Sequence, residues 1–297
     1  MNHVKKVFFI VNKYSGTGLR ADFEQMIADA CKVHHAKYAI EYTLGREHAT
    51  QLASEAGAAG FQKIVAVGGD GTVNEVAQAL VSSPLTMGII PKGSGNGLAR
   101  HLGISVRIDQ ALHCVFTGKM MAMDTFRING KLSLNVSGIG FDGYVANLFD
   151  IEGQRGLQGY TKLVLNEYMQ FREFEAALKI DDRVMERKAF VIAIANSSQY
   201  GNNAKIAPTA SVCDQLLNIS ILKKFPPYRL DFIYSFFSGA IDQSAYCESL
   251  QIRNASIRLK EPMDYHVDGE PAGKAGKFTI ELLPASLQIL APALGRY

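Results

Sequence analysis

The first part of the chain alternates continuous apolar runs with amphipathic segments. The apolar runs predict buried strands at residues 4–11, 39–43, 63–67 and 87–90. Between them, helical spacing of apolar residues or a high alanine content predicts helices at residues 19–30, 48–59 and 72–81. Strands that alternate with helices favour an α/β domain with a parallel sheet. We assign this domain to residues 1–123.

After Met123 the pattern changes to short β-like runs separated by turn residues. Turn pairs such as Asn129-Gly130, Asp181-Asp182 and Asp268-Gly269 separate them. The runs lie at residues 123–128, 132–136, 177–180, 189–195, 217–222, 251–259 and 278–283, with helical inserts at 157–174 and 228–240. This pattern predicts a second, mostly antiparallel domain at residues 124–285.

Composition narrows the class of protein. The chain of 297 residues is long enough for two cores, and its net charge of +3 gives no sign of a nucleic-acid surface. The 4 cysteines are scattered without a Cys-x-x-Cys pair, so neither a zinc site nor a disulfide framework is indicated. No run has the length of a signal peptide core or a membrane span. We expect a cytoplasmic protein whose membrane contact, if it has one, is peripheral.

Three loops of the first domain share one design. Asn12–Gly18, Gly68–Thr72 and Pro91–Gly97 each follow an apolar strand, contain glycine and small polar residues, and precede a helix. Glycine lets the backbone approach a ligand closely, and the N–H groups at a helix start attract phosphate. Three such loops on one sheet edge predict a nucleotide site. Arg20 and Lys92 could also contact phosphates, or could simply be solvated.

Asp70, inside the second loop, adds information about a metal. A carboxylate beside bound phosphate is repelled unless a cation lies between them, and magnesium accepts both kinds of oxygen. The alternative is a turn aspartate that satisfies its own backbone.

A dinucleotide fingerprint is a competing interpretation. Gly16–Ala21 fits G-x-G-x-x-A, and Glu41 stands near the place of a ribose-binding acid. However, Asn12–Ser15 separates the strand from Gly16, whereas the fingerprint needs a tight turn. This interpretation also leaves the other two loops unexplained, and the P-loop pattern is absent.

The order of motifs resembles the diacylglycerol kinase catalytic family, which includes bacterial lipid kinases, sphingosine kinases and ceramide kinases. The resemblance rests on IVNKYSG at 10–16, GGDGTVNEV at 68–76, IIPKGSGNGLARHLGI at 89–104, NVSGIGFD at 135–142, APTASVCD at 207–214 and VDGEP at 267–271. These blocks span nearly the whole chain.

The resemblance implies an α/β nucleotide domain and a β-sandwich, with the active site in the cleft between them. A C-terminal segment, 286–297, would return to the first domain. Its nucleotide, ATP, would be held by Asn12, Lys13, Tyr14, Ser15, Gly16, Thr43, Gly68, Gly69, Asp70, Gly71, Thr72, Val73, Asn74, Glu75 and Ser94. The third loop reads Gly93-Ser94-Gly95-Asn96, which is closer to sphingosine kinases than to the usual bacterial pattern and leaves the acceptor open.

The Val267–Pro271 segment is physically a hairpin turn, and the resemblance makes it catalytic. It implies that Glu270 takes the proton from the lipid hydroxyl and that Asp268 assists, by orienting Glu270 or by holding magnesium through water. It also implies a structural magnesium at Ser211, Asp214 and Leu216, although Gln215 stands where the family usually has glycine. Asp70 would contact the magnesium that is bound to ATP.

We therefore expect an ATP- and Mg²⁺-dependent lipid kinase that phosphorylates diacylglycerol or a related lipid alcohol, with a sphingoid base as the alternative acceptor. A soluble acceptor, as in NAD kinases, is a weaker alternative because those enzymes share GGDGT but lack the later blocks. A non-catalytic nucleotide sensor and a Rossmann oxidoreductase come from other classes. The expected partners are ATP and a lipid at the membrane surface, with no nucleic acid, and we allow for a homodimer.

Overall fold

The computed structural model describes residues 6–16, 18–151 and 157–293. These residues form two compact units. Unit 1 comprises the residues up to Met123 and those from Ala285 onward, and unit 2 comprises Asp124–Pro284. Residues 4 and 5 of the first predicted strand, Thr17 of the first loop and residues 294–297 of the C-terminal segment lie outside the described residues.

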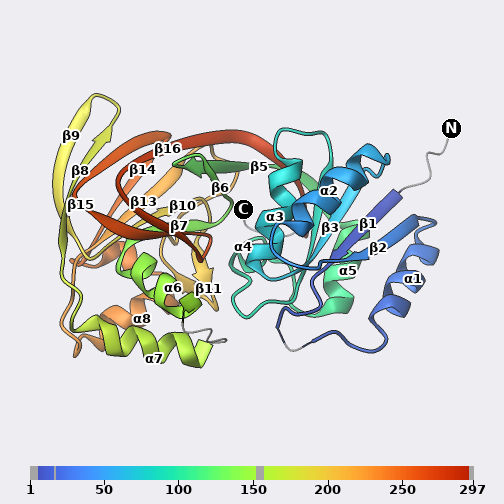
Figure 1. Cartoon of the computed structure of the whole chain (residues 1–297), viewed down its shortest axis with the longest axis horizontal. Helices are drawn as coiled ribbons and strands as arrows, with labels where there is room; N and C mark the ends of the chain where they lie inside the picture. The colour runs from blue at the N-terminus through green and yellow to red at the C-terminus, as the bar shows by residue number, and fades with distance from the viewer. Residues whose placement is uncertain (1–5, 17, 152–156, 294–297) are drawn as a thin grey trace. The chain divides into compact units, whose positions relative to one another are not determined.

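Unit 1 is built on a parallel sheet in the order β4-β3-β1-β2 (Figure 1). Its strands are β1 (Lys6–Val11), β2 (Lys37–Tyr42), β3 (Lys63–Gly68) and β4 (Thr86–Pro91). Its helices are α1 (Phe23–Val33), α2 (His48–Ala58), α3 (Asp70–Leu80), α4 (Gly97–His101) and α5 (Ile108–Thr117). The pairs α2–α3 and α1–α5 pack together on opposite faces of the sheet. Because the strands are parallel, the loops that follow them leave from one edge.

Burial explains the apolar pattern of these strands. β1, β3 and β4 are covered on both faces and are almost wholly buried, as their continuous apolar runs require. β2 lies at the edge of the sheet and is only half-buried. At the other side, Gln288 and Ile289 pair in parallel with Thr86 and Met87 of β4. The segment from Ala285 thus supplies the strand beside β4.

Unit 2 is mostly antiparallel. Its elements are β5 (Lys119–Ile128, which begins in unit 1), β6 (Lys131–Ser133), β7 (Val136–Gly140), α6 (Phe141–Ile151), α7 (Leu157–Tyr168), β8 (Phe174–Ile180), β9 (Arg183–Ala189), β10 (Val191–Ala195), β11 (Gln199–Gly201), β12 (Ala204–Lys205), β13 (Leu217–Leu222), α8 (Leu230–Ser238), a 3₁₀ turn (Ile241–Gln243), β14 (Cys247–Ile252), β15 (Asn254–Val267) and β16 (Glu270–Ala291, which ends in unit 1). The main strand order is β14-β13-β10-β7-β15-β16, and β8 and β9 extend from β15.

Strand β10 shows how unit 2 is layered. Ile192 and Ile194 face the sandwich core that β8, β13, β15 and β16 also line. Val191, Ala193 and Ala195 face a second core, which α6, α7 and α8 cover. Both faces of the strand are therefore buried, which accounts for its unbroken apolar sequence. The parallel α/β unit and the antiparallel sandwich confirm the predicted fold class.

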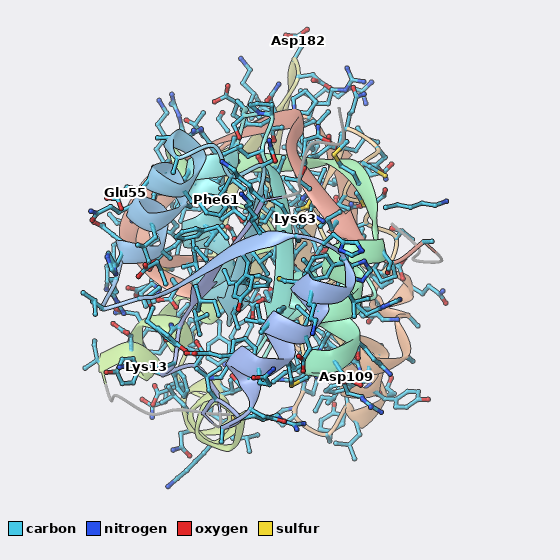
Figure 2. The ribbon with its side chains drawn as sticks, turned by 90° about the vertical axis from the view of Figure 1, so that its right-hand side faces the viewer. Lys13, Glu55, Phe61, Lys63, Asp109 and Asp182 are labelled. Carbon is cyan, nitrogen blue, oxygen red and sulfur yellow. The ribbon has the colours of Figure 1, made fainter. Side chains whose placement is uncertain are left out.

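Several element predictions were wrong in detail. Helix α6 and strand β9 were not predicted, because α6 begins directly after β7 and β9 has charged residues at most exposed positions. The run 132–136 is two elements, the end of β6 and the start of β7. The run 251–259 is divided between β14 and β15, and 278–283 is part of the 22-residue β16. Asp182, labelled in Figure 2, marks the projecting turn between β8 and β9.

Candidate functional site

The first phosphate-type loop is tied to the second by Asn12, directly after β1. Its backbone N–H donates to the carbonyl of Val67 at 2.9 Å, and its side-chain amide donates to Thr72 Oγ1 at 3.2 Å. The side-chain Oδ1 of Asn12 accepts the N–H of Tyr14 at 3.0 Å, which folds the loop back on itself. Lys13, labelled in Figure 2, lies in this loop.

The second loop is shorter than predicted, because α3 begins at Asp70 and not at Thr72. Gly69 is the extended residue before the helix, and Asp70 occupies its first turn. A carboxylate there is favoured by the positive end of the helix dipole. Thr72 and Val73 have buried side chains, so the first turn can offer its backbone N–H groups but not the Val73 side chain to a ligand.

Two glycine contacts bring the loops together. A Cβ atom on Gly93 would lie 2.6 Å from the Cα of Gly69, and one on Gly16 would lie 2.1 Å from the carbonyl oxygen of Lys92. Gly16 also has a φ of +59°, which disfavours a side chain. The three loops therefore meet at distances that only glycine allows.

Lys92 connects the third loop to the first. Its ammonium group donates to the backbone carbonyls of Ser15 and Lys13, and its backbone N–H donates to the carbonyl of Gly68 at 2.7 Å. Burial lowers the pKa of Lys92. Arg20, the other cation considered from the sequence, pairs with Asp22 instead, at 2.7 and 2.9 Å.

Asn96 shapes the third loop and was not singled out from the sequence. It is buried, its backbone is left-handed with a φ of +52°, and its side chain closes on Gly93 through bonds of 2.8 and 2.7 Å. Arg100 donates to the carbonyl of Gly95 at 3.1 Å. These bonds hold the loop with Ser94 exposed at its tip. Asparagine tolerates the left-handed region better than most residues, which is the signal that could have identified it.

Other predicted nucleotide residues lie at the same edge with mixed roles. Thr43 is buried directly after β2, where its N–H donates to the carbonyl of Val11 at 3.0 Å. The carboxylate of Glu75 accepts the N–H of Ala49 at 3.1 Å at the start of α2. Asn74 accepts a hydrogen bond from Gln78 on α3 at 2.9 Å. The side chains of Asn74 and Glu75 are therefore engaged within the protein, and the Glu75 carbonyl accepts a further hydrogen bond from the Thr50 hydroxyl at 2.8 Å.

The β15–β16 hairpin carries the predicted catalytic pair. Val267 pairs with Glu270, and Asp268 and Gly269 form the turn with φ values of +50° and +89°. The Asp268 carboxylate accepts hydrogen bonds from the Ser133 hydroxyl at 2.6 Å and from the N–H groups of Leu134 and Asn135 at 2.9 and 3.0 Å. Asp268 therefore fastens the turn to the segment between β6 and β7. Glu270 is exposed at the start of β16.

Models of known protein families divide the chain near the boundary between its two units. The model of the diacylglycerol kinase catalytic domain matches residues 6–128, and that of the YegS C-terminal NAD kinase beta sandwich-like domain matches residues 135–291. The chain belongs to the lipid kinase family that combines the diacylglycerol kinase catalytic domain with the YegS C-terminal domain.

The relatives in this family align with most of this chain and over most of their own length. A protein of Shewanella frigidimarina named "Probable lipid kinase YegS-like" is 28% identical over 80% of this chain and 79% of its own. One of the same name from Pseudomonas savastanoi pv. phaseolicola is 29% identical over 93% and 90%. The solved structure of a diacylglycerol kinase from Bacillus anthracis strain Sterne is 22% identical, covers 98% of both chains and has a TM-score of 0.77, which supports the fold alone.

The family's structural magnesium was expected at Ser211, Asp214 and Leu216. In the structure, Asp214 accepts the N–H of Leu216 at 3.0 Å, and the Ser211 hydroxyl lies 3.4 Å from the N–H of Cys213. Among the residues that the structure describes, no cluster of three or more His, Cys, Asp or Glu side chains could hold a metal. A magnesium here would depend on one carboxylate, main-chain oxygens and water, which is a donor set that the ion accepts.

Gln215 adopts a backbone conformation that favours glycine. Its φ is +60°, in the left-handed region, and its N–H donates to the carboxylate of Asp124 at 2.7 Å. Asp124 is buried and was not identified from the sequence. A side chain at this φ costs backbone strain. The magnesium site at Ser211, Asp214 and Leu216 stays a prediction.

Proposed function

We propose that this protein is an ATP-dependent lipid kinase that transfers the γ-phosphate of ATP to a lipid hydroxyl. One observation carries the proposal: the loops after β1, β3 and β4 meet through the Gly16 and Gly69–Gly93 contacts at the start of α3. Such a concentration of backbone N–H groups at a helix N-terminus suits the phosphates of a nucleotide. Membership of a lipid kinase family and the names of the relatives support it.

In the proposed reaction, the protein supplies position and charge. The Asn12–Gly16 loop and the N–H groups in the first turn of α3 bind the phosphates, and Asp70 would hold the nucleotide's Mg²⁺. When bound there, the ion would supply positive charge against the negative charge that develops on the transferred phosphoryl group. Glu270 takes the proton of the lipid hydroxyl, and such a base contributes roughly 10²–10⁴ in rate. Asp268 holds the turn, because its oxygens accept three hydrogen bonds from the β6–β7 segment.

The acceptor is a diacylglycerol or a related lipid alcohol, with a sphingoid base as the second candidate. The segment Gly93–Asn96, in which Ser94 is exposed, resembles the corresponding loop of sphingosine kinases. This resemblance is the reason for the second candidate. Incubation with labelled ATP, Mg²⁺ and vesicles that contain one lipid alcohol at a time identifies the acceptor. Nucleotide binding without transfer to any lipid would favour the non-catalytic sensor.

Two substitutions test the roles. Asp70→Ala and Glu270→Gln are each expected to abolish lipid phosphorylation, and Glu270→Gln should leave ATP binding unchanged. Glu281→Gln is a matched control, because Glu281 is an exposed glutamate on the same strand. Full transfer by the Glu270→Gln protein would rule out Glu270 as the base.

Peripheral membrane contact is part of the proposal. Helix α8 buries Phe232 but exposes Leu230, Tyr234 and Phe237, and the neighbouring Tyr228 is also exposed. Aromatic and aliphatic side chains of this kind insert into the headgroup region of a bilayer. Among the described residues, no helix is both long and apolar enough to span a membrane. A homodimer stays a prediction.

Vesicle sedimentation tests this contact. Phe237→Ser should weaken binding to vesicles of an anionic phospholipid. Val184→Ser should not, although Val184 on β9 is an apolar residue that is 66% exposed, compared with 55% for Phe237. Equal binding of the two variants would exclude α8 as the contact.

A further inference from the structure

A buried carboxylate lies behind the catalytic hairpin. Asp142, in the first turn of α6, is 9% exposed and accepts the N–H of Gly143 at 2.8 Å. Its other oxygen, Oδ2, accepts the hydroxyl of Tyr200 at 3.0 Å and lies 3.3 Å from Nε2 of His266. These three contacts compensate for the free energy that burying a carboxylate costs, because a buried charge without hydrogen-bond donors would destabilise the fold.

His266 connects this carboxylate to the turn. It is 3% exposed and lies on β15, two residues before Asp268. Its Nδ1 accepts the backbone N–H of Gly269 at 3.1 Å, so this nitrogen carries no proton. The proton is then on Nε2, which donates to Asp142. The hydrogen bond of one ring nitrogen thus fixes the tautomer at the other.

The surrounding backbone is shaped for this arrangement. A Cβ atom on Gly138 would lie 1.8 Å from Oδ2 of Asp142, and one on Gly143 would lie 2.5 Å from the backbone of Asp264 and Tyr265. Both glycines thus let the start of α6 press against β7 and β15. In addition, the β15–β16 register shifts between Tyr265 and His266. A bulge at this point can re-aim the residues that follow.

The turn is therefore held from two sides. Asp268 binds Ser133, Leu134 and Asn135, while the N–H of Gly269 binds His266, which Asp142 and Tyr200 orient. Glu270 is the next residue along the chain. We propose that His266, oriented by Asp142 and Tyr200, is a positioning residue that sets the direction of Glu270 through the Asp268-Gly269 turn. This inference rests on the proposed function, in which Glu270 is the base.

Two isosteric substitutions separate the two contacts of His266. In His266→Asn, the amide oxygen can replace Nδ1 as acceptor for Gly269, but the bond to Asp142 is lost. In His266→Gln, the amide nitrogen can replace Nε2 as donor to Asp142, but the acceptor for Gly269 is lost. Tyr200→Phe removes one hydroxyl. Tyr246→Phe is its control, because Tyr246 packs against the same core but its hydroxyl contacts Arg229 and not Asp142.

We expect His266→Gln to lower kcat for lipid phosphorylation by about 10- to 100-fold, as misplacing a catalytic group does. His266→Asn should keep most of the kcat, and Tyr200→Phe should lower it severalfold with a folded protein. In all three, the Kd for ATP should stay that of the wild type. Amide hydrogen exchange at Gly269 should accelerate in His266→Gln and not in His266→Asn.

The outcomes are distinguishable. Wild-type kcat in both His266→Gln and Tyr200→Phe, with Glu270→Gln inactive, would overturn the positioning role and leave the proposed function intact. Full activity of Glu270→Gln would instead remove the proposed function. If the His266 variants do not fold, Tyr200→Phe decides: unchanged kcat and unchanged Gly269 exchange overturn the inference.

Discussion

The contact between Gly69 and Gly93 gives the sharpest test of the nucleotide site. In Gly93→Ala, the new Cβ would lie 2.6 Å from the Cα of Gly69 and 3.0 Å from Oδ1 of Asn96. Carbon atoms in contact sit roughly 3.5–4.0 Å apart, so the loops must separate by about 1 Å. The first neighbour is backbone, which cannot rotate away as a flexible side chain could.

A displacement of that size is expected to matter more for function than for folding. Overpacking of one methyl group costs about 1–3 kcal/mol of stability, which a folded domain tolerates. Misplacing a catalytic centre by about 1 Å costs about 10²-fold in rate, or about 2.7 kcal/mol of transition-state stabilisation. We therefore expect kcat/KM for ATP to fall about 100-fold in Gly93→Ala.

The assay pairs calorimetric ATP binding with lipid phosphorylation, and thermal denaturation checks that the protein is folded. Gly45→Ala is the matched control, because Gly45 follows β2 and a Cβ there meets no atom within 4 Å. It should behave as the wild type. A folded Gly93→Ala protein with wild-type ATP affinity and kcat/KM would refute the claim that the two loops share one ligand.

Three further predictions follow from single contacts. Asp268→Asn places an amide donor against donors, so the free energy of unfolding measured in urea should fall by about 2 kcal/mol, whereas Glu270→Gln, on an exposed residue, should change it little. Lys92→Met removes the bonds to the carbonyls of Lys13 and Ser15 and should raise the Kd for ATP about 5- to 10-fold in calorimetry, with an unchanged Kd contradicting the connecting role. Burial lowers the pKa of His101 from 6.5 to about 4, so stability is fully present above pH 6.5 and falls as the pH drops toward 4, by about 1 kcal/mol per pH unit. His101→Gln should flatten this slope in urea titrations between pH 7 and 5, and an unaltered slope would exclude His101 as its source.

The fold class could be predicted from the sequence alone, because a strand that is buried on both faces needs a continuous run of apolar residues. Strands covered on both faces, such as β1 and β3, show continuous apolar runs, and α/β alternation follows from the order of these segments. Leu217–Leu222 was predicted with its observed bounds for the same reason. Strand β9 was missed because its exposed faces carry charge and give no apolar pattern.

The candidate site, too, could be predicted only in part from the sequence. GGDGT and VDGEP were visible in the sequence, because glycines and carboxylates at strand ends are local features. The tertiary structure alone decided what surrounds them. Asp268 faces Ser133–Asn135, far away in the chain, and the Lys92 ammonium crosses to the first loop.

The sequence by itself determined which residues are glycine, acidic or apolar, and therefore where strands end and where a phosphate could approach a backbone. Only the tertiary structure decided that Asp142, Tyr200 and His266 meet behind one turn. The physical reason is that hydrogen bonds between distant segments depend on sheet register and on the close packing of α6 against β15. No periodicity in the chain encodes either of these.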